Sequence, residues 1–117
     1  MDTVAKVDAF FSGQSDAGKV FEALRVRMQS VYPNAQVRVM KTCISFDDPV
    51  PFAYVSFPPK KNLAGIWLSI SLRERLDHPR FVMVVPVSKS RYTVHIHLPD
   101  EDAINDELLE LITLSHR

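Results

Sequence analysis

Two stretches of this chain alternate apolar and polar residues, position by position. Residues 66–73 read IWLSISLR, and residues 91–98 read RYTVHIHL. Because successive side chains of a β-strand point to opposite faces of a sheet, a period of two predicts strands with one apolar and one polar face. A sheet of this kind buries only one face, so the rest of the chain must supply the layer that covers it.

Three segments have the helical spacing that such a layer needs. Apolar residues recur every three or four positions in residues 4–11, in residues 15–31 and again after Pro99. The acidic residues 100–102 are expected to begin the last helix, where they suit the positive end of the helix dipole.

Further strands are expected around residues 37–46, 52–57 and 81–85. Residues 37–46 form one strand-like stretch, in which Lys41, Cys43 and Ser45 share a face. Residues 81–85 read FVMVV, and this continuous apolar run predicts a strand that is more buried than its neighbours.

The order helix, helix, strands, helix predicts an α+β fold with two layers. Short loops between consecutive strands favour a mostly antiparallel sheet of five to six strands. Two N-terminal helices and one C-terminal helix then pack on its apolar face. The chain has 117 residues, the usual size of one domain, and no linker divides it, so residues 1–117 are expected to form a single domain.

Charge is balanced overall but unevenly distributed. The 14 basic and 14 acidic residues cancel, which argues against a protein that coats nucleic acid. Residues 60–91 nevertheless hold seven basic residues against two acidic ones, whereas residues 92–117 hold six acidic residues. Two interpretations stay open: the two parts neutralise each other in the fold, or the basic part binds an anionic partner such as nucleic acid.

Several classes of site and location receive no support from the sequence. The N-terminus lacks a signal peptide, and no stretch approaches the roughly 18 apolar residues of a membrane span. With one cysteine there is no internal disulfide, and the three glycines lack the spacing of a phosphate-binding loop. A cytoplasmic protein without membrane contact and without a cofactor is therefore expected.

The polar face of the expected sheet carries the candidate binding residues. They comprise an indole, two imidazoles, three cations and a hydroxyl: Trp67, His95, His97, Lys41, Arg73, Arg91 and Ser45. A face with these groups suits a small anionic or aromatic ligand, or a protein partner. The alternative is the solvated face that antiparallel sheets commonly have, although such a face rarely needs a tryptophan.

Other chemistry is less well supported. Two imidazoles fall short of the three or four donors that a metal requires, so no metal site is predicted. Cys43 with His95 or His97 could serve as nucleophile and base in a small enzyme, but a lone strand cysteine also fits an inert core position. We therefore assign no catalytic residue. A homodimer, formed through an exposed strand edge or around Trp67, is a further hypothesis.

The chain resembles a known bacterial family. The matching segments are VMKTCISF at residues 39–46, FAYV at residues 52–55, the strand at residues 66–72, and YTVHIHL at residues 92–98 before an acidic terminal helix. This arrangement is similar to the family called domain of unknown function 5655. The resemblance implies a small α+β domain that occurs alone or at the end of larger chains, some of them with nuclease-like parts. It implies an accessory binding role and brings no catalytic residue set.

Overall fold

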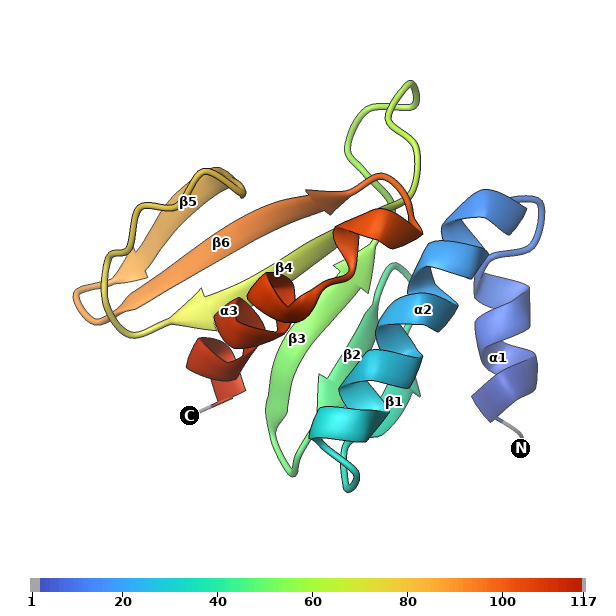
Figure 1. Ribbon diagram of the computed structural model, residues 1–117, viewed down its shortest axis with the longest axis horizontal. Helices are drawn as coiled ribbons and strands as arrows, with labels where there is room; N and C mark the ends of the chain where they lie inside the picture. The colour runs from blue at the N-terminus through green and yellow to red at the C-terminus, as the bar shows by residue number, and fades with distance from the viewer. Residues whose placement is uncertain (1–2, 117) are drawn as a thin grey trace.

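The computed structural model describes residues 3–116, which form three α-helices, one 3₁₀ helix and six strands (Figure 1). The helical elements are α1 (Thr3–Phe10), α2 (Ser15–Val31), η1 (Glu101–Ala103) and α3 (Asp106–His116). The strands are β1 (Gln36–Val39), β2 (Ile44–Asp47), β3 (Pro51–Ser56), β4 (Ile66–Leu72), β5 (Phe81–Ser88) and β6 (Arg91–Leu98). The expected α+β class, with two helices before the sheet and one after it, is confirmed.

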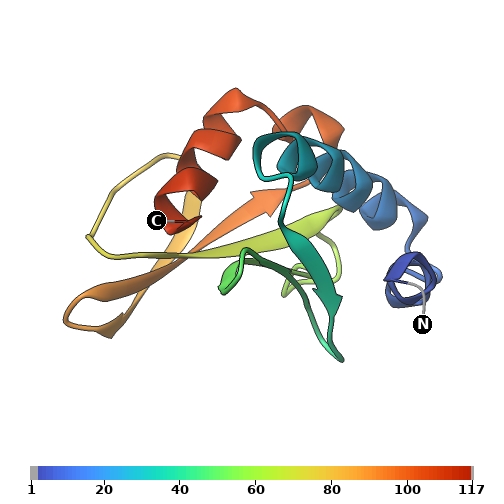
Figure 2. The same cartoon turned by 90° about the horizontal axis from the view of Figure 1, so that it is seen from below.

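All six strands belong to one antiparallel sheet, in the order β1-β2-β3-β4-β6-β5. The outer strands are therefore β1 and β5. Figure 2 shows α2 and α3 on one side of the sheet, with α1 beside α2 at the end near the N-terminus. We call the other side of the sheet the open face, because no helix of residues 3–116 lies across it.

The core lies between the sheet and the helices α2 and α3. Alternate residues of β4 and β6 point into it, as do the apolar stripes of the two helices, and the largest fully buried side chains include Phe21, Phe46, Leu68, Ile96 and Leu108. The period of two in residues 66–72 and 91–98 therefore has the physical cause expected from the sequence: one set of side chains is removed from water by the helices.

Two element boundaries differ from the expectation. Residues 37–46 form two antiparallel strands, β1 and β2, joined by a turn that contains Lys41, so this residue does not share a strand face with Ser45. The last helix begins at Asp106 instead of at residues 100–102, and Glu101–Ala103 form the separate 3₁₀ helix η1. The carboxamide of Asn105 accepts a hydrogen bond from the backbone N–H of Leu108, the N-cap contact that starts α3.

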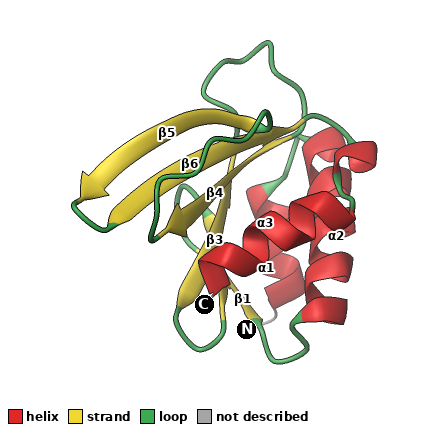
Figure 3. Ribbon diagram, turned by 60° about the vertical axis from the view of Figure 1, so that its left-hand side comes forward, coloured by secondary structure: helices red, strands yellow, loops and turns green. Residues whose placement is uncertain are grey.

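The prediction that residues 81–85 form a strand more buried than its neighbours is wrong. Strand β5 is an outer strand, and only Phe81 and Val84 are partly buried there, whereas its other six residues are exposed. Figure 3 shows β5 and β6 as a curved hairpin that extends away from the helices. A continuous apolar run is typical of a strand covered on both faces, but here the second face and the outer edge have no cover among the described residues.

Helix α3 is fastened to the sheet by a side chain near its end. The hydroxyl of Ser115 donates to the carbonyl of Phe52 at 2.6 Å and accepts the N–H of Ser71 at 3.0 Å. Phe52 and Ser71 lie just beyond Ala53 and Ile70, the last pair of the ladder between β3 and β4. Ser115 therefore hydrogen-bonds one backbone group of each strand at the point where their pairing ends.

Candidate functional site

Trp67 and the two strand histidines meet on the open face. The Trp67 ring lies 5.7 Å from the ring of His95, nearly parallel to it, and 6.1 Å from the ring of His97. The cross-strand pairing of β4 with β6 causes this, because His97 is the direct partner of Trp67. Only 8% of Trp67 is exposed, although it lies outside the main core cluster. The indole is thus covered mainly by its neighbours on the open face.

The imidazoles themselves are tied to the fold. A ring nitrogen of His95, Nδ1, lies 2.7 Å from the hydroxyl oxygen of Ser69, its cross-strand partner, and Nε2 of His97 lies 2.6 Å from the carbonyl oxygen of Ala64. Burial disfavours the charged form of His95 and lowers its pKa below the usual value of 6.5.

The pair Ser69–His95 could pass a proton between its two atoms. Within residues 3–116, neither residue hydrogen-bonds a carboxylate, the third group that orients the base in hydrolytic triads. The arrangement is therefore a neutral hydrogen-bonded pair that helps to hold Trp67 in place.

The remaining candidate residues lie apart from this cluster. Ser45 is fully buried and donates to Asp47, which also accepts from Arg38. Arg73 follows the end of β4, and Arg91 begins β6 at the same end of the sheet. Lys41 lies in the turn between β1 and β2 and is exposed. The structure thus brings together three of the seven candidate residues, namely Trp67, His95 and His97.

Cys43 is half-buried and lies just before β2. Its thiol forms no hydrogen bond to either imidazole within the described chain. The nucleophile-and-base hypothesis for Cys43 receives no geometric support from this placement.

The edge strand β5 carries an exposed apolar surface that the sequence pattern did not indicate. Four of its large apolar residues are exposed: Val82 (58%), Met83 (52%), Val85 (36%) and Val87 (65%). We call these four residues the β5 surface. Met83 pairs with His95 and Val85 pairs with Thr93, so both side chains extend the open face beyond the histidines. The apolar composition of residues 81–87 is the signal for this surface, but the same composition is also typical of a strand buried within its own chain.

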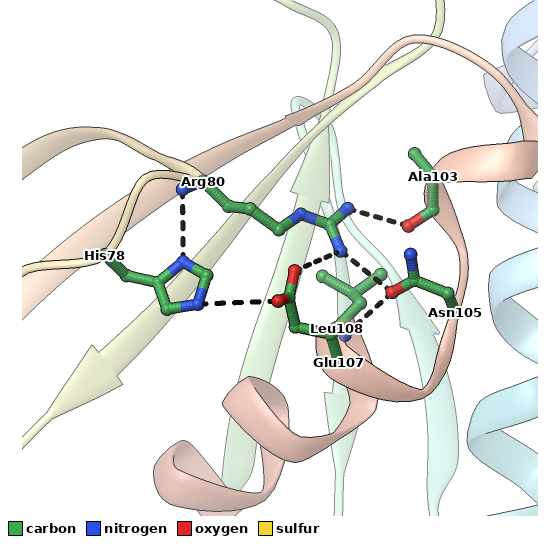
Figure 4. Close-up of polar contacts among 6 residues, drawn as sticks. All are labelled: His78, Arg80, Ala103, Asn105, Glu107 and Leu108. Atoms are coloured by element: carbon green, nitrogen blue, oxygen red, sulfur yellow. Dashed lines mark hydrogen bonds and ion pairs between the residues drawn. The ribbon is translucent and has the colours of Figure 1, made fainter.

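A polar cluster holds the beginning of β5 against the helical layer (Figure 4). The Arg80 guanidinium donates to the carbonyl of Ala103 at 2.7 Å and to the side-chain oxygen of Asn105 at 2.9 Å. It also lies 3.5 Å from a carboxylate oxygen of Glu107, which His78 approaches at 3.9 Å. We call this group the Arg80 clamp. It joins the segment before β5 to η1 and to the start of α3.

The basic residues of the middle segment are mostly unpaired. Of the seven basic residues in residues 60–91, only Arg80 forms an ion pair with an acidic residue in the part of the chain that the structure describes. The other six stand at two places: Lys60 and Lys61 lie in the loop before β4, and the rest lie around its far end, namely Arg73, Arg75, Lys89 and Arg91. Mutual neutralisation of the basic and acidic segments therefore accounts for one of these seven charges.

Another polar contact links the end of α3 to the turn between β2 and β3. The His116 ring stacks on Tyr32 with 4.4 Å between the ring centroids, and its Nε2 lies 2.9 Å from a carboxylate oxygen of Asp48. His116 and Asp48 are 68 positions apart in the sequence, so no local sequence pattern could indicate that they pair.

Two hollows border the helices instead of the open face. One, of about 510 Å³, lies between α1, α2 and β1, and the other, of about 600 Å³, lies between the start of α2 and the loop before β4. None of the seven candidate residues lines either hollow.

Residues 3–116 lack two further kinds of feature. These residues contain no group of three or more His, Cys, Asp or Glu side chains arranged to bind a metal ion. Nor does any helix of this part of the chain have the length and apolar character needed to cross a lipid bilayer.

Comparisons with known proteins locate the chain in a family but assign it no activity. Neither the curated proteins nor the solved structures include a match to this sequence. Among protein families, the one described as Domain of unknown function matches residues 7–117, which is nearly the whole chain. The protein therefore belongs to the family called Domain of unknown function (DUF5655).

Proposed function

We propose that this chain is a protein-interaction module that binds its partner through the β5 surface and the adjoining part of the open face. The observation that carries the proposal is the exposure of four large apolar side chains on one outer strand of eight residues. Exposed apolar patches on soluble domains commonly mark interaction sites, and a free strand edge offers unpaired backbone groups to a further strand.

The two edges of the sheet differ in a way that supports this choice. Strand β1 has four residues, lies next to α1, and carries the Arg38–Asp47 ion pair beside it. Such short, charged edges resist pairing with other chains. Strand β5 is twice as long and has no charged residue between Phe81 and Ser88.

Residues on the open face next to β5 fit a protein partner better than a small molecule. Trp67 is already covered, and the hydrogen-bonding atoms described for Ser69 and His95 bind each other. The rings and valines beyond them offer a broad apolar area with a polar border, which resembles the anatomy of a protein interface.

A photocrosslinking experiment tests the proposal in living cells. A photoreactive residue replaces Val87, which is 65% exposed on β5, or Val26, which is 53% exposed on α2 and serves as the matched control. We expect adducts from position 87, to a second copy or to another protein, that are lost when Val85→Lys is added. Equal adduct patterns from positions 87 and 26, or adducts insensitive to Val85→Lys, would contradict the proposal.

The unpaired cations support a second candidate, a nucleic-acid-associated accessory domain. Six of the seven basic residues in residues 60–91 lack an acidic partner in the described structure, which leaves them free for phosphates. Fluorescence anisotropy with short DNA and RNA, at low and high salt, tests this role. Binding that weakens steeply with salt would support it, and the absence of salt-sensitive binding would remove it.

A further inference from the structure

We infer that the occupant of the β5 surface is β5 of a second copy, paired antiparallel about a two-fold axis. This inference rests on the proposed function and names the partner of the same surface. The pairing would join two six-stranded sheets into one continuous sheet, with the open faces of both copies on the same side.

The charges at the two ends of β5 are opposite. Near its beginning lie Asp77 and the ion pair of Arg80 with Glu107, whose two charges offset each other. The Arg80 guanidinium also binds the carbonyl of Ala103, which directly follows the exposed acidic residues 100–102. Near its end lie Lys89 and Arg91, with Arg73 beside them at the end of β4. Strand β5 is about 26 Å long at 3.3 Å per residue, so the two groups are well separated.

Antiparallel pairing of two copies matches these charges. A two-fold axis perpendicular to the sheet brings the acidic beginning of each β5 next to the basic end of the other. Parallel pairing would instead bring acidic ends together and basic ends together, which is unfavourable. An unrelated acidic peptide would match only the basic end, whereas a second copy matches both.

The apolar side chains match under the same symmetry. Directly opposed residues of an antiparallel pair lie on the same face, so a two-fold axis through Val85 places Val85 against Val85 and Met83 against Val87 of the other copy. Each β5 has irregular pairing with β6 between Phe81 and Met83 and between Pro86 and Ser88, which leaves a regular segment from Met83 to Pro86 at the centre. The Val85 pair therefore lies within the regular part of the strand, and Val87 lies at its irregular end.

Sedimentation velocity tests the association. We expect the wild-type chain to sediment as a dimer that weakens as salt screens the end charges. Val85→Lys places two like charges at the axis and should raise the dimer dissociation constant about tenfold or more. The control Val26→Lys adds the same charge on α2 and should leave the dimer intact. Circular dichroism establishes that both variants fold. A wild-type chain that stays monomeric at the highest attainable concentration would overturn the inference.

Disulfide trapping tests the orientation. Met83→Cys and Val87→Cys chains, both carrying Cys43→Ser to remove the native thiol, are mixed under mild oxidation. Antiparallel pairing predicts mixed disulfides between the two variants, whereas parallel pairing predicts disulfides within each variant alone. Disulfides of the second kind would refute the proposed arrangement. If the chain is monomeric but crosslinks to a different protein through position 87, the proposed function stands and the dimer does not.

Discussion

Replacing Arg80 should loosen the attachment of β5 more than replacing any exposed arginine of this chain. The side chain of Arg80 is 19% exposed and donates two hydrogen bonds, to Ala103 and to Asn105. A hydrogen bond from a charged donor contributes about 1.5–3 kcal/mol. In Arg80→Ala, the side chain of Asn105 still accepts the N–H of Leu108, but the carbonyl of Ala103 loses its hydrogen-bond donor. Because water can replace part of the loss, we expect Arg80→Ala to lower the free energy of unfolding by about 3 kcal/mol.

Urea denaturation measures this change. With a denaturant slope near 1.5 kcal/mol/M, reasonable for a domain of this size, the midpoint should fall by about 2 M. Arg27→Ala is the matched control, because Arg27 also pairs with the start of α3, through Asp106, but both partners are much more exposed, at 39% and 95%. Exposed ion pairs contribute about 1 kcal/mol or less. If the two variants lower the free energy of unfolding equally, the burial and geometry of the Arg80 clamp do not stabilise the fold more than an exposed ion pair does.

Three further changes test other parts of the structure. Because burial lowers the pKa of His95 in the folded state, the unfolded chain binds more protons than the folded chain as the pH falls below about 6.5. The free energy of unfolding should therefore decrease over that range. Urea titrations at several pH values should show a smaller decrease for His95→Gln than for the wild-type chain. Ser115→Ala removes the hydroxyl that hydrogen-bonds both β3 and β4, and should lower the free energy of unfolding by about 1–3 kcal/mol. It should also speed amide hydrogen exchange at Ser71, and an unchanged exchange rate would refute this prediction. Gly65→Ala should prevent stable folding, because at φ +82° its Cβ would lie 2.0 Å from the Leu98 carbonyl oxygen. Gly13 has a similar φ of +78°, but a Cβ there would have no atom within 4 Å, so Gly13→Ala should lower the free energy of unfolding by only about 1–2 kcal/mol. Equal thermal midpoints for the two variants would contradict this prediction.

The sequence predicted the parts of the fold that depend on local periodicity. Residues 66–72 and 91–98 alternate because one set of side chains meets the helical layer, and this relation holds wherever the strand lies in the sheet. The meeting of Trp67 with His95 and His97 follows from the same alternation once the two strands are neighbours.

What the sequence did not predict depends on which strands are neighbours. The run at residues 81–85 has the composition of a doubly covered strand, but composition does not distinguish cover supplied by the same chain from cover supplied by another. The Arg80 clamp joins residues 25 positions apart, and the Arg80 side chain shows no local pattern that would pair it with Asn105. The turn at Lys41 was missed because residues 37–46 contain no glycine or proline to mark it.

The Arg80 clamp and the β5 surface are structurally linked through strand β5. Strand β5 contributes only Phe81 and Val84 to the edge of the core, so packing alone would hold it weakly. The Arg80 clamp fixes its beginning from the helical side and leaves the outer edge and the open face free. A strand held in place before a partner arrives loses less conformational entropy on binding than a mobile one. In the proposed function, Arg80 would therefore favour partner binding through the position of β5, without lying on the β5 surface itself.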